Sequence, residues 1–274
     1  MKKLSVILLS FSMLISFMLS GCSQKKASED EDTIKARIEE YSDVDFIISA
    51  DELESIRKND DVLIFDCNKP EVYEKGHIPG AVNIGIQPFS DISGKIGEEG
   101  WGTVVDKDEM AKKLKELGID NEKTVVFYSD VMNGPGADGR AVWQLRMAGM
   151  DNVKFLNGGY TYWVEKGYET TKEEAKAVPT DKDVKLSELD KSSSATKDYV
   201  YENLDKEVIL DVRTDSEYGG SQNAGEPRGG HIKGAENLLW QDLMYSNGVI
   251  KSKEEIKDIM AEYGVKPEDS FCVY

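Results

Sequence analysis

The stretch that decides the fold is DVLIFDCNKPEVYEKGHIPGAVNI, residues 61–84, because residues 207–238 repeat its pattern. Each stretch has an apolar strand that ends in an aspartate (Asp66 or Asp211), an acidic helix start, a tyrosine and the motif G-H-I-x-G-A. The later stretch carries nine additional residues, SQNAGEPRG at 221–229, before its histidine. A repeat of this length predicts a duplicated domain and not a solenoid of short units.

A second pair of segments supports the duplication. Residues 116–128, ELGIDNEKTVVFY, match residues 262–274, EYGVKPEDSFCVY, without a gap. Both predict a helix end, a glycine, a polar turn and a buried strand. After Tyr128 the first copy continues with a loop, a helix opening at Arg140, the strand VKFLN and a helix from GGYTYW. Strands that alternate with helices predict an α/β fold, with a parallel sheet covered by helices on both faces.

These patterns give the domain organisation. We expect copy one over residues 45–170 and copy two over residues 195–274. A charged, serine-containing connector is expected between them, over residues 171–194. Tyr274 aligns with Tyr128, so copy two is expected to be partial and to lack the loop, strand and helices that follow Tyr128.

The first residues predict where the protein resides. Residues 1–21 combine the positive start MKK with a long apolar run, which is typical of a secretory signal. The run ends in LSGC, residues 19–22, which resembles the bacterial lipobox, where Cys22 is lipidated and becomes the new N-terminus. Residues 22–44 are expected to form a flexible tether. We therefore expect a lipid anchor on the outer face of a bacterial membrane; the alternative is a transmembrane anchor with an incidental cysteine.

Charge and composition exclude several classes of function. The net charge of −18 argues against nucleic acid as a partner, because such a surface repels phosphate groups. Small anions remain candidate ligands at a local site of arginine and backbone N–H groups. Three cysteines and two distant histidines predict neither a disulfide framework nor a metal site. We expect no metal and no cofactor.

Taken in order, five motifs point to one family: LIFDCNKPEVYEKGHIPGAVNI, VVFYSD, FLNGGYTYW, VILDVRTDSEY and GEPRGGHIKGAENLLW. They resemble the tandem rhodaneses, the thiosulfate and 3-mercaptopyruvate sulfurtransferases, over about residues 45–274. The resemblance implies two rhodanese-like domains, of which the first is usually inert. The second carries a catalytic cysteine on the loop after its VVxY-type strand. It also implies a small anionic sulfur donor, a thiol or cyanide acceptor and a persulfide intermediate.

The catalytic slot differs between the copies. Copy one has Ser129 there, and a hydroxyl cannot hold sulfur as a persulfide, so this copy is expected to be structural. In copy two the slot is the residue immediately after Tyr274. Three explanations stay open: an incomplete sequence, a genuine truncation, or a UGA codon read as selenocysteine. A genuine truncation would leave an unpaired sheet edge and an uncovered apolar face. The 274 residues alone are expected to transfer no sulfur.

Two arginines of copy two are candidate substrate-binding residues. Arg213, in DVRTD, replaces Asn68 of copy one, and active relatives usually have arginine there; an ion pair near the site is the alternative. Arg228, in GEPRGGH, is similar to a substrate-binding arginine of mercaptopyruvate sulfurtransferases, and a guanidinium suits a carboxylate or a sulfur oxyanion. Gly219 and Gly220 stand where the family often has another arginine, which leaves the choice between thiosulfate and mercaptopyruvate open.

The remaining cysteines and the histidines are expected to be structural. Cys67 and Cys272 lie in or beside apolar strands and predict buried side chains. His77 and His231 share one slot of G-H-I-x-G-A, also in the inert copy, so we expect them to fix a turn. The alternative function is a non-catalytic surface lipoprotein that binds a partner or an anion. A rhodanese-type phosphatase or arsenate reductase is disfavoured, because those proteins normally have one domain and a different cysteine loop.

Overall fold

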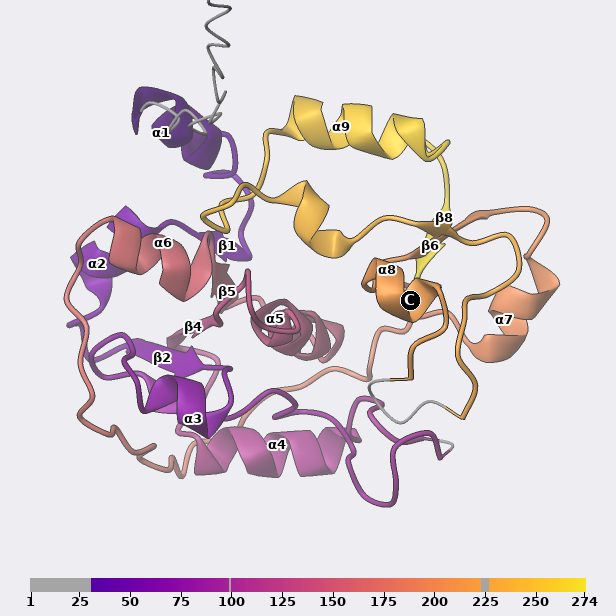
Figure 1. The fold of residues 1–274 in the computed structure, drawn as a ribbon. Coiled ribbons are helices and arrows are strands. Elements are labelled where there is room, and N and C mark those ends of the chain that lie inside the picture. Colours follow the sequence, from indigo (N-terminus) through magenta and orange to yellow (C-terminus); the bar gives the residue numbers. More distant parts are fainter. Residues whose placement is uncertain (1–30, 99, 223–226) are drawn as a thin grey trace, which may run out of the picture.

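The computed structural model describes residues 31–98, 100–222 and 227–274 (Figure 1). The signal segment, Cys22 and the first part of the expected tether lie outside these residues. Among the residues described, no helix combines the length and the apolar character needed to cross a membrane.

Copy one is built on a parallel sheet of five strands, as its alternating pattern predicts. The strands lie in the order β1 (Ile47–Ile48), β5 (Val153–Leu156), β4 (Thr124–Tyr128), β2 (Val62–Asp66) and β3 (Val82–Asn83). Successive side chains of β4 point to opposite faces: Val125 and Phe127 enter one core, and Val126 and Tyr128 enter the other. The α/β prediction with two covered faces is therefore confirmed.

Helices cover both faces of this sheet (Figure 1). On one face lie α4 (Lys107–Glu116) and α5 (Ala137–Met147), and on the other lie α2 (Ala50–Ile56) and α6 (Gly159–Glu165). The short α3 (Pro70–Tyr73) follows β2. Helix α5 begins at Ala137, before the expected Arg140, because Gly136 adopts a left-handed conformation with φ of 70° and starts the helix there.

Copy two repeats the centre of this sheet. Its strands lie in the order β7 (Glu236–Asn237), β6 (Val208–Asp211) and β8 (Phe271–Val273), which are equivalent to β3, β2 and β4. Its helices are α7 (Lys197–Glu202), α8 (Asp215–Tyr218), the 3-10 helix η1 (Trp240–Leu243) and α9 (Lys253–Glu262). Helix α9 packs through Ile259 and Met260 on a small core of Leu210, Leu238 and Val265.

The connector between the copies lies along copy one as a strap, which we define as residues 171–190. Thr171 pairs with His77 in an antiparallel bridge. Farther on, the amide of Thr180 donates to the carbonyl of Lys115 at 2.9 Å, and the amide of Ser187 donates to Ala148 at 2.8 Å. Although the strap is charged, its backbone is fixed to copy one at both ends and in the middle.

The residues just before copy one are also ordered. In place of a flexible tether over residues 31–44, the structure has helix α1 (Glu31–Glu39) and a turn. The reason is apolar packing, because Ile34 and Ile38 lie against a core of copy one. Tyr41 is buried, and its hydroxyl donates to the carbonyl of Lys251 in copy two at 2.5 Å.

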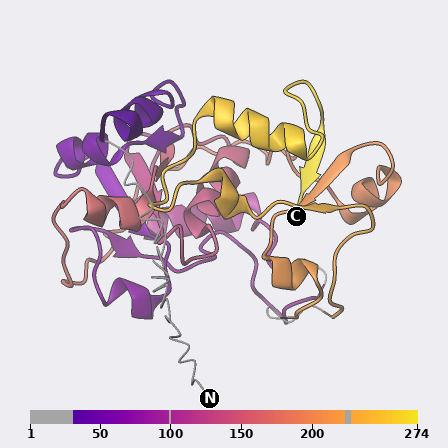
Figure 2. The ribbon, with the colours of Figure 1, turned by 45° about the horizontal axis from the view of Figure 1, so that its top comes forward.

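The chain between η1 and α9 returns to copy one in both views of the molecule (Figures 1 and 2). Met244 and Ile250 form an antiparallel bridge, so residues 244–250 make a small hairpin. Val249 of this hairpin is buried in a core of copy one, and the amide of Ile250 donates to Asn157 Oδ1 at 3.0 Å. The two copies therefore share buried apolar contacts.

Candidate functional site

The carboxyl ends of the central strands form the site in each copy. Strands β2 and β4 end at Asp66 and Tyr128, and in copy two the equivalent residues are Asp211 and Tyr274. The hydroxyl of Tyr128 accepts the amide of Ile78 at 3.1 Å, and that of Tyr274 accepts the amide of Ile232 at 2.8 Å. The repeated motif G-H-I-x-G-A thus holds the tyrosine beside the end of the neighbouring strand.

The histidines of that motif stabilise the turn. The ring of His77 stacks on Tyr73 with centroids 3.6 Å apart, and its Nδ1 lies 2.9 Å from the Tyr73 carbonyl. His231 stacks on Tyr218 at 3.7 Å with the same 2.9 Å contact. Identical geometry in both copies agrees with the expected structural role.

In copy one, a carboxylate of the chain itself lies at the N-terminus of α5. Ser129 is 0% exposed, and its hydroxyl donates to Asp138 Oδ1 at 2.7 Å. Asp138 lies in the first turn of α5, and it accepts backbone hydrogen bonds from Ser129 and Gly139. Burial raises its pKa, and these hydrogen bonds oppose that shift. The helix N-terminus that would bind an external anion is therefore already occupied.

In copy two, a cation lies at the position equivalent to Asn68 of copy one. Asp211 is 0% exposed, and Arg213 binds it through Nε at 3.0 Å and Nη2 at 2.5 Å. Burial favours the neutral form of Asp211, but the hydrogen bonds from Arg213 and Tyr274, together with the positive charge of Arg213, outweigh it and lower the pKa of the carboxyl. The guanidinium lies 5.3 Å from the ring centroid of Tyr274. In copy one the corresponding Asn68 instead accepts the amide of Asp130 at 2.8 Å.

This duplicated geometry has a counterpart among known proteins. The sequence profile of the rhodanese-like domain matches residues 49–166 and 196–274. The chain belongs to the rhodanese-like domain family.

Two relatives and two solved structures show the extent of the similarity. A putative thiosulfate sulfurtransferase of Haloferax volcanii is 30% identical over 212 residues, covering 74% of this chain and 70% of the relative. The sulfur carrier protein TtuD of Thermus thermophilus is 30% identical over 251 residues, covering 85% of this chain and 83% of TtuD. SseA of Escherichia coli, described as a 3-mercaptopyruvate sulfotransferase, superposes with a TM-score of 0.67 at 24% identity over 83% and 87% of the two chains. EanB superposes with a TM-score of 0.70 at 21% identity, over 84% of this chain and 59% of EanB.

The second candidate arginine lies on the loop that Arg213 holds in the second rhodanese-like domain. Arg213 Nη2 donates to the carbonyl of Gly230 at 2.9 Å. Arg228 is two positions before this glycine and is exposed. Within the described part of the chain, Arg228 makes neither a hydrogen bond nor an ion pair. The structure therefore brings both predicted arginines to one loop, with one fixed and the other facing solvent.

Neither described cysteine of these rhodanese-like domains is an activated thiol. Cys67 is fully buried in a core of copy one, and burial raises its pKa. Cys272 is half-buried rather than in the core, with its Sγ 3.4 Å from Glu207 Oε2. Burial and the Glu207 carboxylate raise its pKa as well. Among the residues that the structure describes, no cluster of His, Cys, Asp and Glu could hold a metal ion.

An apolar groove of 510 Å³ lies between α9 and strands β6 and β8. Phe271 and Val273 line it and are 43% and 57% exposed. The equivalent residues of copy one, Val125 and Phe127, are buried in the core to which α5 contributes Ala141 and Leu145. The groove in copy two is thus the counterpart of the place that α5 occupies in copy one.

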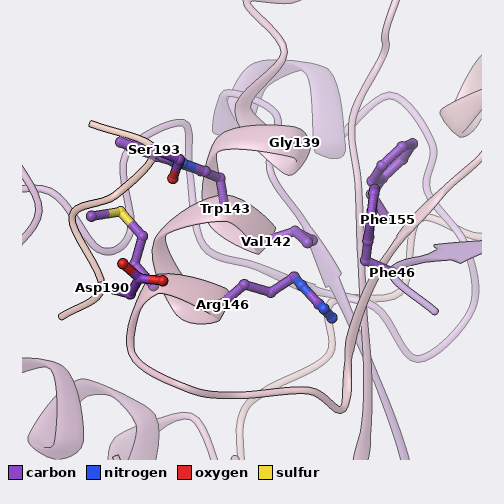
Figure 3. Close-up of a pocket in the computed structure, with 9 residues that line it drawn as sticks. Phe46, Gly139, Val142, Trp143, Arg146, Phe155, Asp190 and Ser193 are labelled. Carbon is purple, nitrogen blue, oxygen red and sulfur yellow. The ribbon is translucent and has the colours of Figure 1, made fainter. Parts of the chain in front are cut away.

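A second cavity, of 420 Å³, lies on the outer side of α5 (Figure 3). Arg146 extends along it, with its guanidinium 5.3 Å from the ring centroid of Phe46 and 3.2 Å from Asp45. Trp143 and Phe155 also line this cavity. It includes none of the predicted site residues.

Proposed function

We propose that the protein is a sulfurtransferase, which moves a sulfane sulfur from thiosulfate or 3-mercaptopyruvate to a thiol or to cyanide. Membership of the rhodanese-like family supports this proposal, as do relatives named as thiosulfate sulfurtransferases. The observation that carries it is the Arg213–Asp211 pair beside Tyr274, because copy one has the uncharged Asn68 at the equivalent position and holds the Asp138 carboxylate at the start of α5.

Arg213 has the chemistry to hold an anionic donor. Its Nε and Nη2 are bound to Asp211, while Nη1 has no hydrogen-bond acceptor among the described residues. Nη1 can therefore donate a charge-assisted hydrogen bond to one oxygen of a sulfonate-like group or of a carboxylate. Arg228, exposed on the same loop, is the second proposed contact to the donor.

The sulfur acceptor is proposed to be the residue that follows Tyr274. The register supports this position, because Tyr128 is followed by Ser129 at the entrance to the loop that leads into α5. The groove lined by Phe271 and Val273 also supports it, since a helix equivalent to α5 would cover that groove. A cysteine or a selenocysteine fits the slot, since a helix N-terminus stabilises a thiolate or a selenolate.

The proposed reaction has two balanced steps. The thiolate or selenolate attacks the outer sulfur of thiosulfate, a new bond to that sulfur forms, and sulfite leaves with the electron pair of the broken S–S bond. Cyanide or an acceptor thiolate then attacks the same outer sulfur. Thiocyanate or a persulfide leaves, and the nucleophile is regenerated. With 3-mercaptopyruvate as donor, the C–S bond breaks instead, and a proton completes pyruvate.

The first experiment reads the gene past the Tyr274 codon and assays the encoded protein with thiosulfate and cyanide. We expect a Cys or in-frame UGA codon at position 275, thiocyanate formation by the complete protein, and none by residues 1–274 alone. Thiocyanate formation by residues 1–274 that is lost on Cys272→Ala would overturn the proposed acceptor. A complete protein that transfers no sulfur would favour the non-catalytic lipoprotein that binds a partner or an anion.

We also propose that the protein is anchored by lipid at Cys22 on the extracytoplasmic face of the membrane. The sequence of residues 1–22 supports this location, and the net charge of −18 argues against nucleic acid as a partner. Cys22→Ser is expected to move the protein from the membrane fraction to the soluble fraction. Retention of the variant in the membrane would contradict the lipid anchor.

A further inference from the structure

The inert loop of copy one, residues 129–136, is held in a fixed shape although it has no nucleophile. Its first residue is bound by Asp138, with 2.7 Å between the Ser129 hydroxyl and the carboxylate. The amide of Asp130 donates to Asn68 Oδ1 at 2.8 Å, and its carbonyl accepts the amide of Asn133 at 3.1 Å. Contacts with Asp138 and Asn68, and one hydrogen bond within the loop, thus define the surface that the loop presents to a neighbour.

That neighbour is the start of η1 in copy two. Gln241 Nε2 donates to two carbonyls of the inert loop, Val131 at 3.1 Å and Met132 at 3.0 Å. The indole of Trp240 covers Gly136, where a β-carbon would lie 3.5 Å from the ring. Gly136 has φ of 70°, so a side chain there would both strain the backbone and press on the indole.

The contact continues to the proposed sulfur site. The amide of Trp240 donates to the carbonyl of Val212 at 3.2 Å, and the amide of Val212 donates to the carbonyl of Tyr274 at 3.0 Å. Val212 also precedes Arg213 in the chain. Two backbone hydrogen bonds therefore join Trp240, which packs against the inert loop, to the carbonyl oxygen of Tyr274, the residue before position 275.

We propose that Trp240 and Gln241 are positioning residues for sulfur transfer, seated on the inert loop of copy one. The inference rests on the proposed function and explains why a loop without a nucleophile keeps its shape. Val212 is hydrogen-bonded to both Trp240 and Tyr274 and precedes Arg213, so the contact with the inert loop fixes the positions of Tyr274 and Arg213. This contact thereby sets the distance between the sulfur acceptor and the bound donor. Small displacements of reacting groups lower rates strongly, because the bound geometry must match the direction of attack.

The test uses the complete protein with the variant Gln241→Ala and the control Tyr41→Phe. Gln241→Ala removes hydrogen bonds between copy two and the inert loop, whereas Tyr41→Phe removes a hydrogen bond between the segment before copy one and Lys251 of copy two. We expect Gln241→Ala to lower kcat for thiosulfate about tenfold or more, with a much smaller change in KM. Tyr41→Phe is expected to change kcat less than about twofold. If the two variants lose kcat equally, and only in proportion to their loss of stability, the inference is overturned.

Hydrogen exchange gives a readout that does not depend on activity. In Gln241→Ala, the amide of Val212 is expected to exchange about tenfold faster than in the wild-type protein, and in Tyr41→Phe at an unchanged rate. Unchanged exchange at Val212 in Gln241→Ala, with an active wild-type protein, overturns this inference alone. An inactive wild-type protein overturns the proposed function first.

Discussion

At the residue scale, one buried aspartate in each copy shows how a single neighbour changes the chemistry. Burial raises the pKa of Asp66, and hydrogen bonds, led by the amide of Asn68, oppose this shift only in part. Its Oδ2 has no hydrogen-bond partner within the described residues. Burial also raises the pKa of Asp211, but the hydrogen bonds from Arg213 and Tyr274, together with the Arg213 charge, make the net shift of this pKa downward. The pKa of Asp66 is thus shifted upward, and the pKa of Asp211 is shifted downward.

We predict that Asp211→Asn lowers the free energy of unfolding by about 2–4 kcal/mol at pH 7, because it leaves Arg213 without its partner carboxylate. The matched change Asp66→Asn is expected to alter stability by about 1 kcal/mol or less. The stability that Asp211 contributes is fully present above its unfolded pKa of about 3.9 and is lost as pH falls through the lower folded pKa. Ionising Asp66, whose folded pKa is raised, costs stability instead, and this cost disappears as pH falls.

Urea denaturation of both variants between pH 3 and pH 7 checks this prediction. The difference between wild type and Asp211→Asn should shrink at the acidic end. A larger loss for Asp66→Asn than for Asp211→Asn at pH 7 would show that the ion pair does not stabilise copy two.

At the scale of elements, the duplicated turn is the same in both copies, but the strap covers only one of them. His77 is 0% exposed, and its Nε2 lies 3.0 Å from the carbonyl of Glu173 in the strap. The hydroxyl of Tyr73 accepts the amide of Ala175 at 3.1 Å, which fixes the next part of the strap. His231 makes the equivalent Nδ1 contact but is exposed. The turn is therefore a common element, and its burial depends on the strap.

We predict that His77→Ala lowers the free energy of unfolding by about 3 kcal/mol, since it empties a buried site and removes two hydrogen bonds. His231→Ala, the matched change in copy two, should cost about 1 kcal/mol or less. Limited proteolysis at Lys172 and Lys176 gives an independent measure, because release of the strap should speed cleavage there in His77→Ala only. Equal costs for the two histidines would mean that the strap adds nothing to the turn.

At the scale of the whole molecule, the internal repeat was sufficient to predict the two copies, their parallel sheets and the place of Arg213. It could not predict the contacts between distant segments. The carboxylate of Asp138 fills the inert site through a turn geometry that depends on Gly136, and nothing in the loop's composition distinguishes it from a solvated aspartate. The strap and α1 have charged compositions typical of linkers, yet their few apolar residues and backbone groups fix them to copy one.

The same distant contacts join the two copies through a shared core. The hairpin 244–250 of copy two places Val249, 1% exposed, in a core of copy one, and α1 closes over it. Arg37 of α1 lies 4.1 Å from the ring centroid of Tyr245 and 3.8 Å from Glu255 in copy two. Copy one therefore depends on a side chain that lies far away in the sequence.

We predict that Val249→Asp destabilises both copies together, by about 3 kcal/mol or more, because it buries an unpaired carboxylate in a core of copy one. Val178→Asp is the matched control: this valine is 80% exposed, so its change should alter stability by about 0.5 kcal/mol or less. Calorimetry should show one transition for wild type and control, and one transition at lower temperature for Val249→Asp. Two separate transitions, of which only one responds to Val249→Asp, would mean that the copies unfold independently. The hairpin would then be a surface contact and not part of a shared core.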